Sequence, residues 1–185
     1  MTDTWIISVL HTRYTMMIED IKFSIGLCEV TYGDMTLTYL ADKCVFSAIP
    51  KYQKVYGGKG KAIQKYLLDE YNVSLDLSLH EESYNNLKLA LSHESNENGF
   101  YATPQNVDTT GKPLIIHPKQ KGESKEHDIV VFRAIVDPEQ EFIKVYDKKL
   151  DNLQLRFIGV PMDKGDSELL RYFYIGDWEA EGVIP

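Results

Sequence analysis

The chain has 185 residues, of which 43% are hydrophobic and 26% charged, and its formal net charge is −8. This length and apolar content predict one globular domain over residues 1–185 and leave little room for a second. The acidic balance argues against a protein that coats a DNA duplex, because clustered Lys and Arg are needed to displace counterions from phosphates. No apolar run approaches the roughly 20 residues of a membrane span, and the first residues lack the basic start of a signal peptide. We therefore expect an unprocessed protein that is made in the cytoplasm and has no membrane segment.

The first part of the chain predicts strands, because apolar and polar residues alternate with a period of two. This alternation is clearest over Ile21–Ile25, which Gly26 follows, and it returns over Thr36–Tyr39. A third β-rich segment, Cys44–Phe46, leads to Pro50. We expect Pro50 to end that strand, because proline cannot donate to a sheet ladder.

A stretch without acids follows, Lys51 to Lys65, which holds five lysines. Its Gly57-Gly58 pair is the expected tip, and the flanking segments are compatible with a long hairpin or an irregular arm over residues 47–66. Two interpretations of the lysines stay open. They form a solvated surface loop, which is the usual role of a charge run, or they bind an acidic patch on a neighbouring copy. In the second case the assembly interface consists of Lys51, Lys54, Gly57, Gly58, Lys59, Lys61 and Lys65.

The next segment combines a strand with a helix. Alternating apolar residues from Val73 to Leu79 predict a strand with one face in the core. Ser78 and Glu81 then match a capping box, in which a hydroxyl and a carboxylate satisfy free amides at a helix start. The apolar spacing beyond them is helical, so we predict a helix from about residue 79 to 92 that packs on the sheet.

Residues 92–127 are poor in apolar side chains and rich in Gly and Pro. A loop of this length is uncommon in a compact domain, so we interpret it as a functional polar insertion with one short strand at Leu114–Ile116. Many strands with a single helix predict a mainly β fold, a β-sandwich or barrel with one packed helix and long loop or hairpin arms. The strands expected after the insertion are Ile129–Val136, Phe142–Tyr146, Leu153–Val160 and Leu169–Ile175.

The sequence offers no pattern for catalysis, a cofactor or a metal. The glycines near Lys59 do not make a phosphate loop, because Val55 stands where the first Gly is required and Ala62 where Ser or Thr is required. The five histidines lack ligand spacing and are expected to be ordinary surface residues. Cys28 and Cys44 lie in no CxxC pair, so we expect buried, reduced thiols.

Five segments of the chain are similar, in their order and spacing, to segments of a known protein family: Ile18–Gly26, Val73–Leu91, Asp128–Ala134, Phe157–Pro161 and Phe173–Asp177. This order resembles the tail tube (major tail) proteins of bacteriophages. The resemblance implies a β-sandwich subunit, without enzymatic activity, that forms a homo-oligomer of stacked sixfold rings in the virion tail. It also implies a hollow tube that DNA crosses without specific binding, and partners such as the tape measure and tail terminator proteins.

The lysine stretch departs from this family, whose inner wall is usually acidic, so we expect it between rings rather than in the lumen. The insertion would be an inter-ring arm or an external decoration. Two further interpretations stay open: a capsid-decorating or head–tail joining protein, and, from a different class, a small-molecule-binding β-barrel or an enzyme of unseen mechanism.

Overall fold

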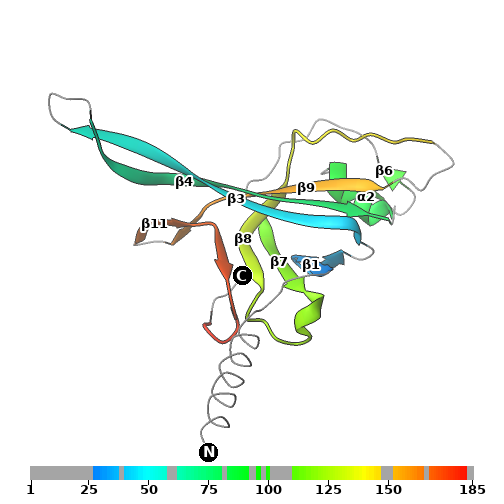
Figure 1. The fold of residues 1–185 in the computed structure, drawn as a ribbon. Helices are drawn as coiled ribbons and strands as arrows, with labels where there is room; N and C mark the ends of the chain where they lie inside the picture. The colour runs from blue at the N-terminus through cyan, green and yellow to red at the C-terminus, as the bar shows by residue number, and fades with distance from the viewer. Residues whose placement is uncertain are drawn as a thin grey trace, which may run out of the picture.

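A computed structural model gives the fold and describes residues 27–37, 40–57, 62–80, 83–91, 95–96, 99–100, 110–146, 152–164 and 167–182. In this part the chain is mainly β, with one α-helix (Figure 1). The predicted fold class, mainly β with a single helix, is confirmed. The strand predicted at Ile21–Ile25 lies outside the described residues.

Eight strands form one antiparallel sheet. Its strands are β1 Cys28–Tyr32, β2 Met35–Leu37, β3 Leu40–Gly57, β4 Ala62–Leu79, β7 Lys112–Pro118, β8 Ile129–Val136, β9 Leu153–Gly159 and β12 Phe173–Ile175. The remaining elements are the helix α2 Tyr84–Leu91, the 3-10 turn η1 Lys119–Lys121, and the short pairs β5 Ser95–Asn96 with β6 Gly99–Phe100 and β10 Met162–Lys164 with β11 Ser167–Arg171.

The sheet is folded into two facing layers. Its strand order is β2-β1-β7-β8-β9-β4-β3, with β12 also paired to β8, and β3, β4 and β9 cross over β1, β7 and β8 (Figure 1). The ring of Tyr32 in β1 lies 4.9 Å from that of Phe157 in β9, and the Tyr32 hydroxyl donates to the carbonyl oxygen of Ala134 at 3.0 Å. Phe46 in β3 meets Phe173 in β12 at 5.4 Å between ring centres. The core therefore lies between the layers, as in a sandwich.

Strands β1 and β3, from opposite sides of the folded sheet, also meet. Cys28 in β1 and Cys44 in β3 are free thiols, each partly buried. A hydrogen bond between them lowers the pKa of Cys28 and, together with burial, raises the pKa of Cys44. The first and third strands of the chain are thus brought side by side by the fold of the sheet, although they do not pair.

Strand β4 confirms the predicted alternation, because Val73, Leu75, Leu77 and Leu79 are all at most 4% exposed. Burial of such side chains stabilises a fold by about 1.5–3 kcal/mol each. Opposite Val73 stands Gly159, where a Cβ atom would lie only 2.8 Å from the Val73 Cβ. Glycine is therefore needed at the end of β9 for the two strands to pack.

Three predicted segments are wrong in their bounds or type. Strand β3 continues past Pro50 to Gly57, because β3 ends the order of described strands and a missing N–H is tolerated where it faces away from the partner. Phe142–Tyr146 is not a strand: residues 141–146 have no regular structure, and Tyr146 is 91% exposed. The strand predicted over Leu169–Ile175 is split into β11 and β12, which pair with β10 and β8 respectively.

The insertion predicted over residues 92–127 is also wrong in part. Residues 112–118 of it form β7, which lies inside the sheet between β1 and β8. Leu114 and Ile116 of β7 are buried in the core, so this segment belongs to the body rather than to an added loop. Residues 101–109 lie outside the described residues.

The predicted helix cap at Ser78 is wrong. Ser78 belongs to β4, where its hydroxyl lies 2.7 Å from Oε1 of Gln154, directly across on β9. The helix starts later, at Tyr84, and the hydroxyl of Ser83 accepts a hydrogen bond from the backbone N–H of Asn86 at 3.2 Å. Ser83 is therefore the N-cap, in the usual cap-to-third-residue arrangement. Glu81 lies outside the described residues.

Candidate assembly interface

The outer halves of β3 and β4 leave the body as a two-stranded hairpin (Figure 1). We call residues 51–57 with 62–70 the arm. The pairing runs from Lys51 with Glu70 to Gly57 with Ala62, so of the two forms that the sequence left open, the structure shows the hairpin. At about 3.4 Å per strand residue, the arm reaches roughly 20–25 Å from the body. An isolated two-stranded hairpin is only marginally stable in water, so an arm of this kind gains stability when another surface covers it.

One face of the arm is a continuation of the buried face of the sheet. Along β3, Phe46 faces the core, and residues 52, 54 and 56 share its side because side chains alternate. Their partners across the hairpin are Leu68, Tyr66 and Ile63. The rings of Tyr52 and Tyr66 confirm the shared face, with centres 6.3 Å apart and planes at 84°. We call this surface the aromatic face: Tyr52, Tyr56, Ile63, Tyr66 and Leu68.

The aromatic face is exposed to solvent. Its five members are between 42% and 59% exposed. A contiguous apolar patch on a subunit marks a site of interaction, since water contact with it is unfavourable. Complete burial of an aromatic side chain removes about 150–250 Å² from water, and the three tyrosines, 53–59% exposed, still have somewhat more than half of that area to lose.

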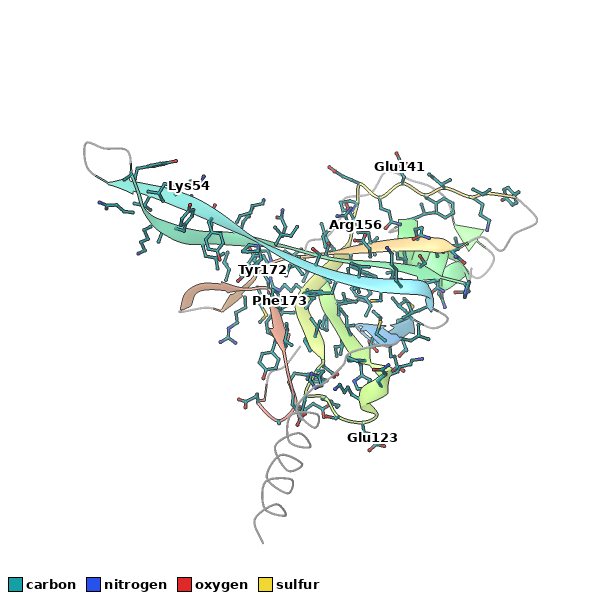
Figure 2. The ribbon with its side chains drawn as sticks, in the orientation of Figure 1. Lys54, Glu123, Glu141, Arg156, Tyr172 and Phe173 are labelled. Atoms are coloured by element: carbon teal, nitrogen blue, oxygen red, sulfur yellow. The ribbon has the colours of Figure 1, made fainter. Side chains whose placement is uncertain are left out.

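The predicted interface residues are brought together only in part. Lys51, Lys54, Gly57 and Lys65 all lie on the arm (Lys54 is labelled in Figure 2), whereas Gly58, Lys59 and Lys61 lie outside the described residues. Lys51 forms an ion pair with Glu70 across the hairpin, so its charge is compensated within the arm. Lys54 sits in the middle of the aromatic face, and Lys65, opposite Val55, is on the other face.

The lysines of this stretch are conspicuous in the sequence, whereas the aromatic face is not. In the sequence, the aromatic face can be found as Tyr52, Lys54 and Tyr56, which are spaced two residues apart. The signal is hidden by Pro50, because a proline ordinarily ends a strand and the alternation beyond it then has no sheet to belong to.

A groove opens where the arm joins the body. Its volume is about 800 Å³. Tyr71 of β4 lies at the root of the arm, with its ring centre 5.9 Å from that of Tyr172 and 5.7 Å from that of Phe173 (Figure 2 labels the last two). The full lining combines β4, β8, the β10–β11 pair, β12 and the segment after β12: Tyr71, Phe132, Met162, Leu170, Arg171, Tyr172, Phe173, Tyr174, Glu181 and Gly182.

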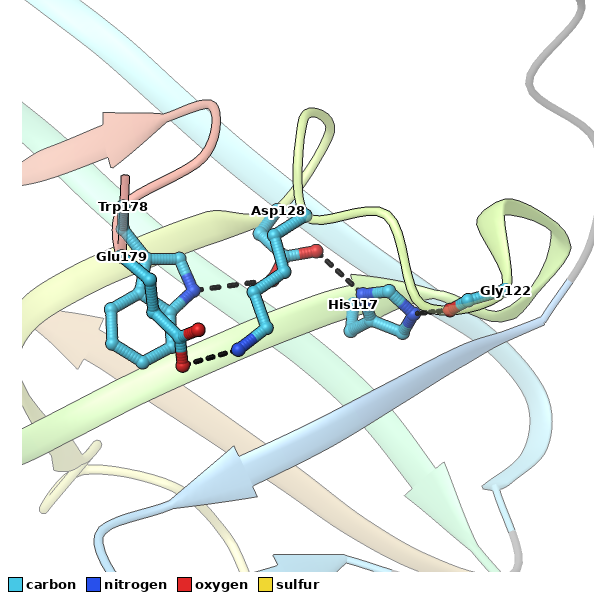
Figure 3. Close-up of polar contacts among 6 residues, drawn as sticks. His117, Gly122, Asp128, Trp178 and Glu179 are labelled. Atoms are coloured by element: carbon cyan, nitrogen blue, oxygen red, sulfur yellow. Dashed lines mark hydrogen bonds and ion pairs between the residues drawn. The ribbon is translucent and has the colours of Figure 1, made fainter. Parts of the chain in front are cut away.

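The segment after β12 is held in place by a polar cluster (Figure 3). Asp128, only 2% exposed, is the centre of this cluster. Its carboxylate accepts from Trp178 Nε1 at 3.2 Å and lies 2.6 Å from Nδ1 of His117. Lys125 and Glu179 add an ion pair beside the Trp178 ring. These contacts fix the chain that forms one wall of the groove.

His117 is not the ordinary surface histidine that the sequence predicted. Both of its ring nitrogens face oxygens: Nδ1 faces Asp128, and Nε2 lies 2.7 Å from the carbonyl oxygen of Gly122 (Figure 3). Only the doubly protonated ring can donate to both. The hydrogen bond to Asp128 is the main cause that raises the pKa of His117; the Gly122 carbonyl and the charges of Asp128 and Glu29 raise it further, while burial opposes them.

Other kinds of site find no support in the described residues. Within them, no group of three or more His, Cys, Asp or Glu side chains is placed to hold a metal ion. None of the helices in the described ranges is long and apolar enough to cross a membrane.

Comparisons with known proteins leave the family of this chain unassigned. No protein-family model matches it, and no curated protein matches it. Among solved structures, the fold is similar to a cryo-EM structure of the anti-feeding prophage cap, described as a tube terminating cap. The alignment has a TM-score of 0.51 at 10% identity and covers 87% of this chain and 99% of the other. At this identity the likeness is one of fold.

Proposed function

We propose that this chain is a structural subunit of a phage-like tail, which uses the arm to join its neighbours within a ring rather than between rings as the sequence suggested. The observation that carries this proposal is the aromatic face, because it extends the core surface of the sheet beyond the body and leaves it uncovered. The likeness to a tube terminating cap, which covers 87% of this chain, supports it, since a similar chain fold occurs in a tail-related particle. The role is one of assembly, without catalysis or a cofactor.

In its full form the proposal is that the subunit builds a tail tube. Rings of the subunit, six to a ring as the resemblance implies, stack into a conduit for genome delivery, and the tube contacts tape measure and terminator proteins in the virion. The net charge of −8 supports this use, because a wall that repels phosphates lets DNA pass without being held.

A second candidate is a subunit that caps the end of such a tube. The description of the structurally similar chain as a tube terminating cap favours it. The two candidates differ in what the pure protein builds: a tube subunit stacks its rings, whereas a cap forms single rings. Negative-stain microscopy of the purified chain therefore distinguishes them.

Two further roles would produce different particles. A capsid-decorating or head–tail joining protein would not form tubes. A small-molecule-binding barrel would remain monomeric and would use the groove, whose volume is within the roughly 300–1,000 Å³ of ligand pockets. Such a protein has no use for an exposed aromatic arm.

The proposed function is tested by substitutions on the two faces of the arm. Tyr66→Asp places a charge in the aromatic face, and Leu67→Asp places the same charge on the adjacent residue of the opposite face; both side chains are exposed, by 56% and 40%. We expect wild-type protein and Leu67→Asp to form rings or tubes, and Tyr66→Asp to remain a folded monomer by light scattering and circular dichroism. Assembly of Tyr66→Asp equal to that of Leu67→Asp, or a wild-type chain that stays monomeric at high concentration, would overturn the proposal.

A further inference from the structure

We propose that the groove at the root of the arm receives the aromatic face from a second copy of this chain, so that neighbouring subunits join head to tail. The inference rests on the proposed function and deepens it by naming the surface that the arm contacts. It is carried by the position of the groove, by its lining and by its charge.

The position of the groove argues against its own arm as the occupant. Tyr71, which lines the groove, pairs with Pro50 at the root of the arm. The next residue outward on the same face of β3 is Tyr52, the first member of the aromatic face. Groove and aromatic face are thus successive parts of one sheet surface, and the arm leads away from its own groove. None of the arm residues lines the groove of its own chain in the described structure.

The lining of the groove suits aromatic side chains. Tyr71, Tyr172 and Phe173 meet edge to face, an arrangement that further rings can extend. Leu170 on β11 is 52% exposed although it lines the groove, so it offers apolar surface that the subunit itself does not cover. A volume of about 800 Å³ has room for more than one inserted side chain.

The charges of the two surfaces are complementary. The segment that walls the groove contains Asp177, Glu179 and Glu181, of which Glu179 is paired with Lys125. Glu181 lies in the groove lining. On the arm, Lys51 is already paired with Glu70, whereas Lys54 stands among the tyrosines of the aromatic face. The lining also holds one base, Arg171, so an arm inserted through its aromatic face is favoured in the register that brings Lys54 to Glu181 and keeps it away from Arg171.

The proposed contact joins two different surfaces, the arm of one subunit and the groove of the next. Because the two surfaces differ, the contact can build assemblies larger than a dimer. A contact between two arms would be the same on both subunits and would stop at a dimer. An arm in a groove leaves one free arm and one free groove on every pair, so addition continues, and it stops in a ring when the rotation between subunits closes. The proposed contact is therefore the kind that a ring requires.

The test uses two matched groove variants and one mixture. Leu170→Asp puts a charge into the groove, while Ile175→Asp puts it on β12 outside the lining; the two side chains are similarly exposed, 52% and 57%. We expect Leu170→Asp to remain monomeric and Ile175→Asp to assemble as wild type. Tyr66→Asp has an intact groove and Leu170→Asp an intact arm, so their equimolar mixture should form a one-to-one dimer by sedimentation and nothing larger.

The failures of the two proposals are distinguishable. If wild type does not assemble, the proposed function fails. If wild type assembles and Leu170→Asp assembles equally well, or if the mixture stays monomeric, only the groove contact is overturned.

If circular dichroism shows that Leu170→Asp is unfolded, a pair of charge-reversal variants tests the groove contact instead. Lys54→Glu and Glu181→Lys should each raise the concentration needed for assembly about 1.5- to 5-fold. The double variant, in which the two charges are exchanged, should restore the wild-type concentration. No restoration overturns the contact.

Discussion

At the scale of single residues, the cluster around Asp128 shows how a buried charge is accommodated. A carboxylate that is removed from water is costly unless it is paired and hydrogen-bonded. Asp128 meets this condition with His117 on one side and Trp178 on the other. Because Trp178 belongs to the segment that walls the groove, the protonation of one histidine bears on the stability of the candidate interface.

The stability of the protein should decrease as the pH rises above about 6.5, because of His117. Its pKa is raised in the folded state, so its stabilising contribution is complete below the unfolded value of about 6.5 and is lost as the pH rises through the folded value. The neutral ring can no longer donate to both Asp128 and Gly122. We expect the free energy of unfolding, measured with urea, to fall over this range in wild type and to change less in His117→Gln.

The control for this experiment is His80→Gln, since His80 is an exposed histidine whose ring lies 2.8 Å from Asn152. It should keep the pH dependence of wild type. The assignment to His117 is contradicted if His117→Gln follows the wild-type curve.

At the scale of elements, the strand-to-helix unit shows how two similar serines acquire different roles. Ser78 and Ser83 both precede helical spacing, but β4 extends through Ser78 because its alternation of buried residues runs on to Leu79. The hydroxyl of Ser78 is then used across the sheet, at Gln154. Ser83 is the residue that is free to cap α2.

Substitution by aspartate should separate these two roles. At Ser83, Asp is a good N-cap and we expect little change, while Ser83→Ala should lower the free energy of unfolding by about 0.5–2 kcal/mol. At Ser78, which is 8% exposed, Asp would place a carboxylate beside the acceptor oxygen of Gln154 and should destabilise more than Ser83→Ala. Thermal or urea denaturation measures all three variants. Equal losses for Ser83→Asp and Ser78→Asp would show that Ser83 is not the cap.

At the scale of the whole molecule, an acidic body carries an arm with a lysine stretch and an aromatic face. The proposed assembly combines an apolar contact, which supplies most of the free energy, with exposed charge pairs that are worth only about 0.2–1 kcal/mol each. Repetition around a ring multiplies these small contributions. Assembly is therefore expected to respond to salt, although the subunit fold is not.

Salt should raise the protein concentration that assembly needs. The Debye length falls from about 10 Å at 0.1 M to about 3 Å at 1 M ionic strength, which screens pairs between the arm and the acidic wall. Changing Lys54, Lys59 and Lys61 together to Glu should abolish assembly at low salt while circular dichroism shows a folded monomer. Light scattering over a salt series checks both statements. If the triple variant forms particles as wild type does, the lysine stretch is a solvated loop.

The sequence by itself determined the elements whose signal is local. Alternation predicted the strands at Val73–Leu79 and Leu153–Val160 with their buried faces, and helical spacing predicted the helix, because both patterns are properties of neighbouring residues. The Gly57-Gly58 pair likewise indicated a projecting segment between two strands. These features follow from the chain itself, without knowledge of what it packs against.

The tertiary structure alone decided which segments meet. Pro50 is tolerated because β3 is the last of the described strands in the sheet, and the Lys112–Pro118 segment became a central strand because β1 and β8 supply partners on both sides. The His117–Asp128–Trp178 cluster and the groove each join residues far apart in the chain. Pairing partners, burial and hydrogen bonds depend on distances in space, and a one-dimensional pattern does not contain those distances until the sheet has folded.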